Sequence, residues 1–311
     1  MTDIKEKYSL VIIGAGPAGL TASIYASRYK IDNLIIGQAV GGLVFEAHKV
    51  CNFPSEKEIT GRELTEKMRD HAESLGASIL MDKVIRISSE KDGFKISTGL
   101  GRDILAKTLL LAVGTEHRKL NLPNEDKFLG KGISYCATCD AMFYKDKTVA
   151  VIGGSNSAHT ASLHLSEIAK HVYQIYRGNK MRGETVWIDQ LLGDNNIEVI
   201  YNTQVVGVKG EEKLEGIVLD SPHKGQKKIA IDGLFIEIGT IPRTNLAKEL
   251  HLDLDGFEYI KVGLDQSTNK KGVWAAGDIT NNSNGFRQIV TASSEGAIAI
   301  GSIFKYLQTL K

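Results

Sequence analysis

The sequence predicts an α/β protein with two Rossmann-like (βαβ) dinucleotide-binding domains, the second inserted into the first. Two segments of similar pattern carry this prediction: SLVIIGAGPAGLTASIYASR begins at Ser9, and TVAVIGGSNSAHTASLHLSE begins at Thr148. Each segment reads as a short strand of β-branched residues, a glycine turn and a helix rich in small residues. That order is typical of the unit that binds a dinucleotide.

Length and composition agree with this fold class. Two domains are the usual expectation for 311 residues. Lys and Arg together number 38 against 37 for Asp and Glu, so no charge excess favours a nucleic-acid or acidic-membrane partner. Three cysteines are too few for a disulfide-rich secreted scaffold. Glycines and a proline break the apolar N-terminal run, which argues against a signal peptide or a membrane span, and we expect a cytoplasmic protein.

Hydrophobic periodicity and turn residues predict the remaining elements. The segment 59–76 is expected to form a helix that ends at Gly76, and Asp92-Gly93 is expected to form the turn of a hairpin. Further strands are predicted at 33–37, 108–114, 172–176, 197–202 and 233–239.

Two prolines suggest where the chain crosses between the domains. Pro123 follows an extended stretch, and Pro242 lies in GTIPRT. We therefore expect a discontinuous first domain at 1–116 and 246–311. The inserted second domain is expected at 117–245, and it carries the closely spaced cysteines.

The first glycine turn, VIIGAGPAGL, has the G-x-G-x-x-G spacing between a strand and a helix. Gly14 permits the tight turn, Gly16 lets the backbone approach a pyrophosphate, and Gly19 permits close helix–strand packing. The alternative is a structural turn without a ligand. An acidic residue that would bond a ribose is expected about 20 residues further on, but Gly37 and Gln38 stand there.

A second candidate for the same site lies near the C-terminus, in GVWAAGDITNN. Gly277 and Asp278 follow a predicted strand, and Asp278 can accept a hydrogen bond from a sugar-alcohol hydroxyl. The next helix, QIVTASSEGAIAIGSIF, can direct its N-terminus at an oxygen of a bound ring. The alternative is an ordinary strand followed by a turn.

The stretch SYCATCDAMF places Cys136 and Cys139 two residues apart, with Asp140 next. A zinc site is disfavoured because it needs about four ligands, and Cys51 is the only other cysteine. A structural disulfide is disfavoured because the loop it closes is very short. A redox dithiol fits, because a helix start lowers a thiolate pKa and Asp140 can pass a proton when the disulfide opens.

Several motifs together resemble low-molecular-weight thioredoxin reductases: GAGPAGLTASIYASR, GGLVFEAHKVCNFP, YCATCD, GGSNSA, GTIPRT and GVWAAGD…FRQIVTA, in this order. The likeness extends from about residue 8 to about residue 307. It implies an FAD-binding domain split around an inserted NADPH domain, and a homodimer. It also implies electron flow from NADPH to FAD, then to the dithiol, then to thioredoxin. No metal is implied.

The resemblance assigns roles to individual residues. Cys139 is expected to face the flavin and receive the electron pair, and Cys136 to attack the disulfide of the partner. Asp140 favours reduction, because related dithiol oxidases carry histidine there. Cys51 stands where the family has an acid, and we expect a buried or inert thiol, with a regulatory thiol as the alternative. The residues expected to contact FAD are Gly14, Gly16, Gly19, Asn52, Gly277, Asp278, Arg287 and Gln288.

One flavin face cannot hold the dithiol and a nicotinamide at once. The resemblance therefore implies that the inserted domain rotates during the cycle and that its two linkers act as hinges. The linkers are expected near Pro123 and Pro242.

The likeness is weakest at the expected site of the electron donor. Ser155 replaces a glycine of the family's second turn, Thr160 and Ala161 replace two acids, and Gly178 replaces the middle arginine of the run that holds the 2′-phosphate. We expect NADPH as the donor. The alternatives are NADH, reduced ferredoxin with a degraded nucleotide site, or a redox-sensing flavoprotein that does not turn over. The residues expected to contact NADPH are Gly153, Gly154, Ser155, Asn156, Arg177 and Arg182, with Lys180 in a supporting role.

Overall fold

The computed structural model describes residues 4–310, and the chain forms two compact units. Unit 1 runs to Glu116 and resumes at Pro242, whereas unit 2 comprises His117–Ile241. The two crossings of the chain, β7 (Thr115–His117) and β16 (Thr240–Pro242), pair with each other as a two-stranded ribbon. Within the described part of the chain, no helix is both long and apolar enough to cross a membrane.

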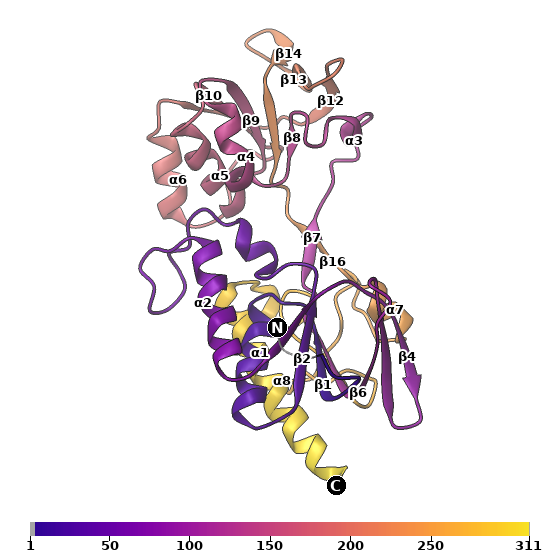
Figure 1. The fold of residues 1–311 in the computed structure, drawn as a ribbon. Coiled ribbons are helices and arrows are strands. Elements are labelled where there is room, and N and C mark those ends of the chain that lie inside the picture. Colours follow the sequence, from indigo (N-terminus) through magenta and orange to yellow (C-terminus); the bar gives the residue numbers. More distant parts are fainter. Residues whose placement is uncertain (1–3, 311) are drawn as a thin grey trace. The chain divides into compact units, whose positions relative to one another are not determined.

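Unit 1 is built on a seven-stranded sheet with the order β3-β2-β1-β6-β5-β4, in which β17 also pairs with β6 (Figure 1). The parallel part joins β3, β2, β1, β6 and β17, and the β4–β5 hairpin continues it in antiparallel fashion. The strands are β1 (Lys7–Ile13), β2 (Asn33–Gly37), β3 (Ser78–Met81), β4 (Val84–Glu90), β5 (Gly93–Thr98), β6 (Asp103–Leu111) and β17 (Val273–Ala275).

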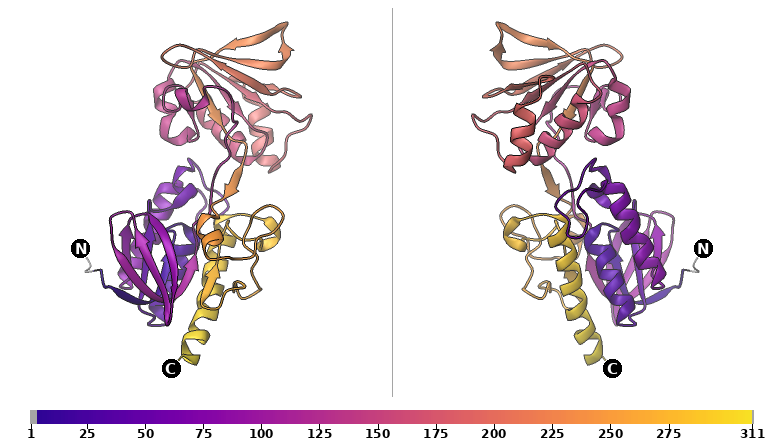
Figure 2. Two further views of the ribbon diagram at one scale, coloured as in Figure 1. Left: turned by 90° about the vertical axis from the view of Figure 1, so that its right-hand side faces the viewer. Right: turned by 90° about the vertical axis from the view of Figure 1, so that its left-hand side faces the viewer.

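Alternate residues of the central strands face two different cores. Leu10 and Ile12 of β1 face the helices, and Val11 and Ile13 face the opposite layer. On the helical face, α1 and α8 pack against each other along the sheet (Figure 2). The helices of unit 1 are α1 (Pro17–Arg28), η1 (Gly42–Glu46), α2 (Gly61–Ser74), α7 (Asn245–Glu249), η3 (Ser283–Gly285) and α8 (Ile289–Thr309).

Local sequence explains several of these elements. Helix α2 begins after Thr60 with a capping box: the Thr60 side chain accepts from the Glu63 amide at 3.2 Å, and Glu63 accepts from the Thr60 amide in return. The predicted helix over 59–76 and the predicted hairpin are confirmed, but the turn of the hairpin is one residue earlier, at Lys91-Asp92, and Gly93 begins β5 opposite Glu90. The predicted strand at 108–114 ends earlier, at Leu111, because the chain turns at Gly114, where φ is +61°.

Unit 2 contains a parallel five-stranded sheet with the order β11-β10-β9-β15-β8. Helices cover one face, and the antiparallel ribbon β12-β13-β14 covers the other (Figures 1 and 2). The strands are β8 (Ile133–Ser134), β9 (Thr148–Ile152), β10 (His171–Ile175), β11 (Ile197–Ile200), β12 (Val205–Lys209), β13 (Gly216–His223), β14 (Gln226–Ala230) and β15 (Gly233–Ile236). The helices are α3 (Glu125–Phe128), α4 (Ala137–Asp140), η2 (Ala141–Tyr144), α5 (Asn156–Ser166) and α6 (Thr185–Leu192).

Each unit therefore contains the same sequence of elements. In unit 1 a buried strand, the Gly14 turn and α1 follow one another, and in unit 2 the order is β9, the Gly153 turn and α5. The predicted class of two Rossmann-like folds is confirmed. In both units the glycine turn lies at the carboxyl end of a central strand, which is where such sheets bind ligands.

Candidate functional site

Unit 1 contains a cavity of about 930 Å³ at the carboxyl ends of its parallel strands. Its walls come from the first glycine turn, from the ends of β2 and β6, from the loop after β17 and from the start of α8. This volume is at the upper end of the range for small-molecule sites. Six of the predicted FAD-contacting residues line it: Gly14, Gly16, Gly277, Asp278, Arg287 and Gln288.

The three glycines of the first turn have different physical reasons to be glycine. A Cβ on Gly14, where φ is +115°, would lie 2.1 Å from the Ala112 carbonyl oxygen. A Cβ on Gly19 would lie 1.9 Å from the Gly14 carbonyl oxygen, so α1 packs directly on the turn. A Cβ on Gly16 meets nothing closer than the Gly41 carbonyl oxygen at 3.9 Å. Gly16 therefore leaves space in the cavity itself, as a bound pyrophosphate requires.

The N-terminus of α1 faces this space. Its N-cap is Gly16, which makes no side-chain hydrogen bond to the helix. Because the first amides of a helix lack intrahelical partners, they can donate to a phosphate. Gln38 also lines the cavity, near the place where an acid was expected. Its carboxamide can donate and accept hydrogen bonds.

Arg287 is held at the cavity wall by an aromatic ring. Its guanidinium carbon lies 3.7 Å from the centre of the Tyr259 ring, and its Nε donates to the Asp278 carbonyl oxygen at 3.4 Å. A cation over an aromatic face is a favourable arrangement. Asn52 does not line the cavity and instead donates to Gln288 Oε1 at 3.1 Å. Sequence reasoning missed Tyr259, because no local motif points to it.

Glu295 supports the loop that presents Asp278, and sequence reasoning missed it as well. Its side chain is 4% exposed. It accepts from the Gly277 amide at 2.8 Å, from Thr280 Oγ1 at 3.0 Å and from Ser283 Oγ at 2.5 Å. An acid within the apolar pattern of the last helix is the signal that points to it.

Asp278 itself is largely enclosed. Its pKa is raised to about 6 by burial and, to a smaller extent, by the nearby Glu295, while Arg287 acts in the opposite direction. A carboxyl group with such a pKa changes its protonation state close to neutral pH.

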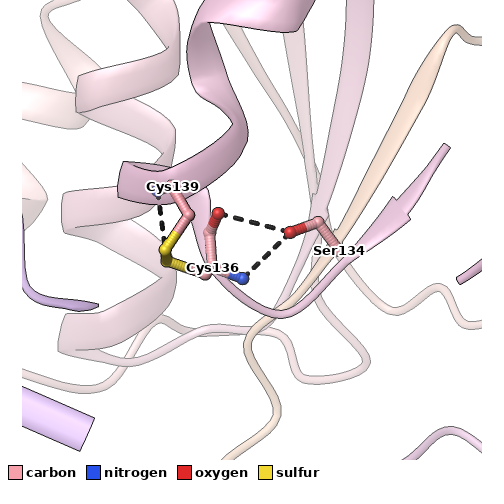
Figure 3. The surroundings of a disulfide bond; sticks show 3 residues. All are labelled: Ser134, Cys136 and Cys139. Carbon is pink, nitrogen blue, oxygen red and sulfur yellow. Dashed lines mark hydrogen bonds between the residues drawn. A yellow bond between two sulfur atoms is a disulfide. The ribbon is translucent and has the colours of Figure 1, made fainter. Parts of the chain in front are cut away.

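The cysteine pair of unit 2 is a disulfide. The Sγ atoms of Cys136 and Cys139 are 2.07 Å apart (Figure 3). The Cys136 amide donates to Ser134 Oγ at 3.0 Å, and the Ser134 hydroxyl donates to the Cys136 carbonyl oxygen at 3.2 Å. The Cys139 amide donates to Cys136 Sγ at 3.1 Å. Paired sulfurs at the start of α4 match the redox prediction and not half of a zinc site.

The amide of Cys139 is well placed to stabilise a thiolate on Cys136. A hydrogen bond to an ionised acceptor is stronger than one to a neutral acceptor. Cys136 is half-buried and Cys139 is exposed. Asp140 follows directly, and its amide donates to the Cys136 carbonyl oxygen at 3.3 Å.

The residue before the disulfide is anchored in its own unit. The Tyr135 hydroxyl donates to Glu125, and the Tyr135 ring stacks on His117 with centroids 5.6 Å apart. Glu125 is buried and also accepts from the amides of Leu120 and Leu122. Burial and the hydrogen bond raise the pKa of Tyr135, so its hydroxyl keeps its proton.

Two large apolar side chains beside the disulfide face solvent. Met142 is 70% exposed and Phe143 is 71% exposed, and both lie in η2, directly after α4. Exposed apolar side chains next to a reactive group are typical of a protein docking surface. Cys51, in unit 1, is exposed and unpaired, so the thiol is not buried, and its being inert stays a prediction.

The second glycine turn is enclosed more tightly than the first. A Cβ on Gly154 would lie 2.4 Å from the Tyr176 ring, and a Cβ on Gly178 would lie 2.7 Å from the same ring. Ser155 is the N-cap of α5, is exposed and makes no capping bond. Arg182 lies beside this turn, because its amide donates to the Gly154 carbonyl oxygen at 2.8 Å.

Asn156 and Arg177 were also predicted to contact NADPH. Asn156 lies near the second glycine turn, and Arg177 lies near the end of β10. Asn156 donates to Glu184 Oε1 at 3.1 Å and accepts from the Glu184 amide at 2.8 Å. Arg177 is exposed and follows Tyr176, the residue after β10. The Glu184 carboxylate lies near the N-terminus of α5, so a phosphate bound there would meet a group of like charge.

Comparison with known proteins agrees with this site. The family model for pyridine nucleotide-disulphide oxidoreductases matches residues 8–296. A thioredoxin reductase of Treponema pallidum is 37% identical over 311 residues, which is 99% of this chain and 100% of the relative. The crystal structure of thioredoxin reductase from T. acidophilum has a TM-score of 0.91 and 36% identity, covering 99% of this chain and 100% of that one. A ferredoxin-flavin thioredoxin reductase from Clostridium acetobutylicum has a TM-score of 0.53 and 31% identity, covering 97% and 99%.

Two dinucleotide-type units and a redox disulfide define a flavoprotein disulfide oxidoreductase. The chain belongs to the pyridine nucleotide-disulphide oxidoreductase family. Within that family its resemblance to low-molecular-weight thioredoxin reductases is confirmed over the whole chain. The family and the solved structures imply that it binds a flavin and a nicotinamide nucleotide.

We predict that Gly16→Val abolishes flavin binding without unfolding the protein. The Cβ has room at this position and the backbone φ is ordinary, so the side chain occupies cavity space only. We expect flavin affinity to fall at least about 100-fold, as measured by the flavin absorbance of the purified protein. Gly256→Val is the matched control, because that glycine also has open space around it but lies outside the cavity. Retained flavin in Gly16→Val would contradict the assignment.

We predict that Asp278 makes the flavin-free protein less stable as the pH rises. Its folded pKa of about 6 lies above the ordinary value, so its stabilising contribution is complete below about pH 4 and is lost as pH rises through 6. Relative to Asp278→Asn, wild-type stability should fall by about 3 kcal/mol between pH 4 and pH 7. Urea unfolding at several pH values measures this difference, with Asp92→Asn as an exposed control. Parallel pH profiles for wild type and Asp278→Asn would contradict it.

Proposed function

We propose that this protein is a thioredoxin-disulfide reductase. Electrons pass from NADPH to FAD, from FAD to the Cys136–Cys139 disulfide, and from the resulting dithiol to thioredoxin. The observation that carries the proposal is the accessible disulfide with exposed Met142 and Phe143 beside it. The similarity to thioredoxin reductases along the whole chain supports it. The enzyme is proposed to work as a homodimer in the cytoplasm.

The cavity of unit 1 fits FAD. Gly16 and the amides at the start of α1 would hold the pyrophosphate, and Asp278 would bond a hydroxyl of the sugar alcohol. Arg287 adds positive charge, and its stacking on Tyr259 fixes its direction. When bound, FAD supplies two-electron exchange between a nicotinamide and a disulfide.

The reduced dithiol transfers its electrons in two exchanges. The Cys136 thiolate attacks one sulfur of the thioredoxin disulfide, which forms a mixed disulfide and releases the other thioredoxin sulfur as a thiolate that takes a proton. Cys139 then attacks Cys136 Sγ, which restores the internal disulfide and releases the second thioredoxin thiol. The amide of Cys139 stabilises the attacking thiolate, and Asp140 is the proposed proton carrier.

NADPH is the proposed donor, with its phosphates near Gly153, Gly154, Ser155 and Asn156. The guanidinium groups of the exposed residues Arg177 and Arg182 would bind the 2′-phosphate. One observation favours reduced ferredoxin as a second candidate: the Tyr176 ring fills the space over Gly154 and Gly178. The similarity to a ferredoxin-flavin thioredoxin reductase is in line with that alternative.

An anaerobic titration separates these donors. The purified protein is mixed with NADPH, NADH or reduced ferredoxin, and the loss of flavin absorbance is followed in time. Bleaching by micromolar NADPH at the rate of turnover supports the proposal. Bleaching by ferredoxin alone would identify ferredoxin, and not NADPH, as the donor. Reduction of the flavin without electron transfer to thioredoxin would indicate a redox-sensing flavoprotein.

We predict that Cys136→Ser abolishes electron transfer to thioredoxin and leaves reduction of the flavin by its donor intact. The exchange cannot begin without the attacking sulfur, so thioredoxin reduction should fall at least about 10³-fold. Cys51→Ser is the control, because this exposed cysteine is unpaired. Full transfer by Cys136→Ser would contradict the mechanism.

We predict that Phe143→Ala raises KM for thioredoxin roughly tenfold with little change in kcat. A buried aromatic anchor at a protein interface commonly contributes one to a few kcal/mol, about a tenfold change or more. Steady-state kinetics with varied thioredoxin measures this. Phe257→Ala is the matched control, because Phe257 is 81% exposed but lies in unit 1. An unchanged KM in Phe143→Ala would show that η2 is not the docking surface.

A further inference from the structure

A buried polar network lies beneath the second glycine turn. His159 of α5 and Gln174 of β10 are fully buried, at positions where a parallel sheet and its covering helix are normally apolar. Buried polar side chains are costly unless they are hydrogen-bonded. In the part of the chain that the structure describes, Gln174 Oε1 has no hydrogen-bond partner, which adds to that cost. Two apolar side chains at positions 159 and 174 would avoid this cost.

The Gly153 carbonyl group determines which atom donates in each hydrogen bond of this network. Gln174 Nε2 lies 3.1 Å from the Gly153 carbonyl oxygen and 2.9 Å from His159 Nδ1. Because a carbonyl only accepts, this end of the amide must be the NH₂ group. His159 Nδ1 therefore accepts, and the proton of the neutral ring is on Nε2. His159 Nε2 then donates to the Arg182 carbonyl oxygen at 2.8 Å.

The network fixes Arg182 from both sides of its backbone. The Arg182 carbonyl accepts from His159, and the Arg182 amide donates to the Gly154 carbonyl oxygen at 2.8 Å. Its side chain is anchored too, because Nε donates to the Tyr176 hydroxyl at 2.9 Å. Arg182 as a residue is nevertheless exposed. Arg182 is thus presented to solvent in a preset direction, beside the start of α5.

We propose that His159, supported by Gln174, is a positioning residue that holds Arg182 for the 2′-phosphate of the nucleotide and so sets the preference for NADPH over NADH. This inference rests on the proposed function, in which NADPH is the donor. A guanidinium that is already ordered loses less freedom when it binds phosphate. NADH lacks that phosphate, so the preset direction of Arg182 does not strengthen the binding of NADH.

The test measures binding of NADP⁺ and NAD⁺ to the oxidised holoenzyme by calorimetry, so that no flavin reduction intervenes. We expect His159→Leu to weaken NADP⁺ about tenfold and to change NAD⁺ less than about twofold. His159→Gln places a donor near the Arg182 carbonyl and should recover most of the loss. In an Arg182→Gln background, His159→Leu should have no further effect on NADP⁺.

Gln174→Leu provides a second variant if His159→Leu does not fold. It leaves α5 intact but removes the donor to His159 Nδ1, so it should weaken NADP⁺ in the same direction. The inference would be overturned if these variants had the same ratio of NADP⁺ affinity to NAD⁺ affinity as the wild type. Equal losses for both nucleotides, or a wild type that does not prefer NADP⁺, would also overturn it. Failure of the wild type to reduce thioredoxin with any donor would instead overturn the proposed function.

Discussion

Close contact between backbones at glycine residues is the constraint on which unit 1 depends. Helix α1 packs so closely on the turn before it that no side chain fits at Gly19. Helix α8 approaches α1 in the same way, because a Cβ on Gly296 would lie 2.2 Å from the Ala18 carbonyl oxygen. These two contacts fix the starts of both helices beside the strand ends. The cavity exists because two helix N-termini and a row of strand ends are held together there.

The two glycine turns show how one backbone plan serves different purposes. Ala158 in unit 2 occupies the place of Gly19, and Ser155 occupies the place of Gly16. Ala158 packs directly on Gly153, because a Cβ on Gly153 would lie only 2.7 Å from the Cβ of Ala158. Ser155 therefore adds an exposed side chain at the N-cap position that has none in unit 1. Unit 2 therefore keeps the helix packing of the fold and alters only the surface that meets a ligand.

Local sequence was sufficient for several elements and for the disulfide. The capping box of α2, the β4–β5 hairpin and the cysteine spacing each depend on residues a few positions apart. The supporting residues were missed because their partners are distant in the chain. Tyr259 meets Arg287 and Glu295 meets Gly277, and such pairings form only after the sheet has brought the segments together. The register of a sheet and the burial that follows from it are not readable from a local pattern.

Two carboxyl groups under the cavity couple ligand binding to protonation. Glu295 accepts hydrogen bonds from three donors. Asp278 lies near it, and its raised pKa means that it is the group that takes up a proton. A ligand hydroxyl that donates to Asp278 favours the ionised form, and Arg287 is nearby to balance the charge. Binding of a polyhydroxyl chain at this point therefore lowers the pKa of Asp278. Below about pH 6, such binding releases a proton, so it becomes weaker as the pH falls.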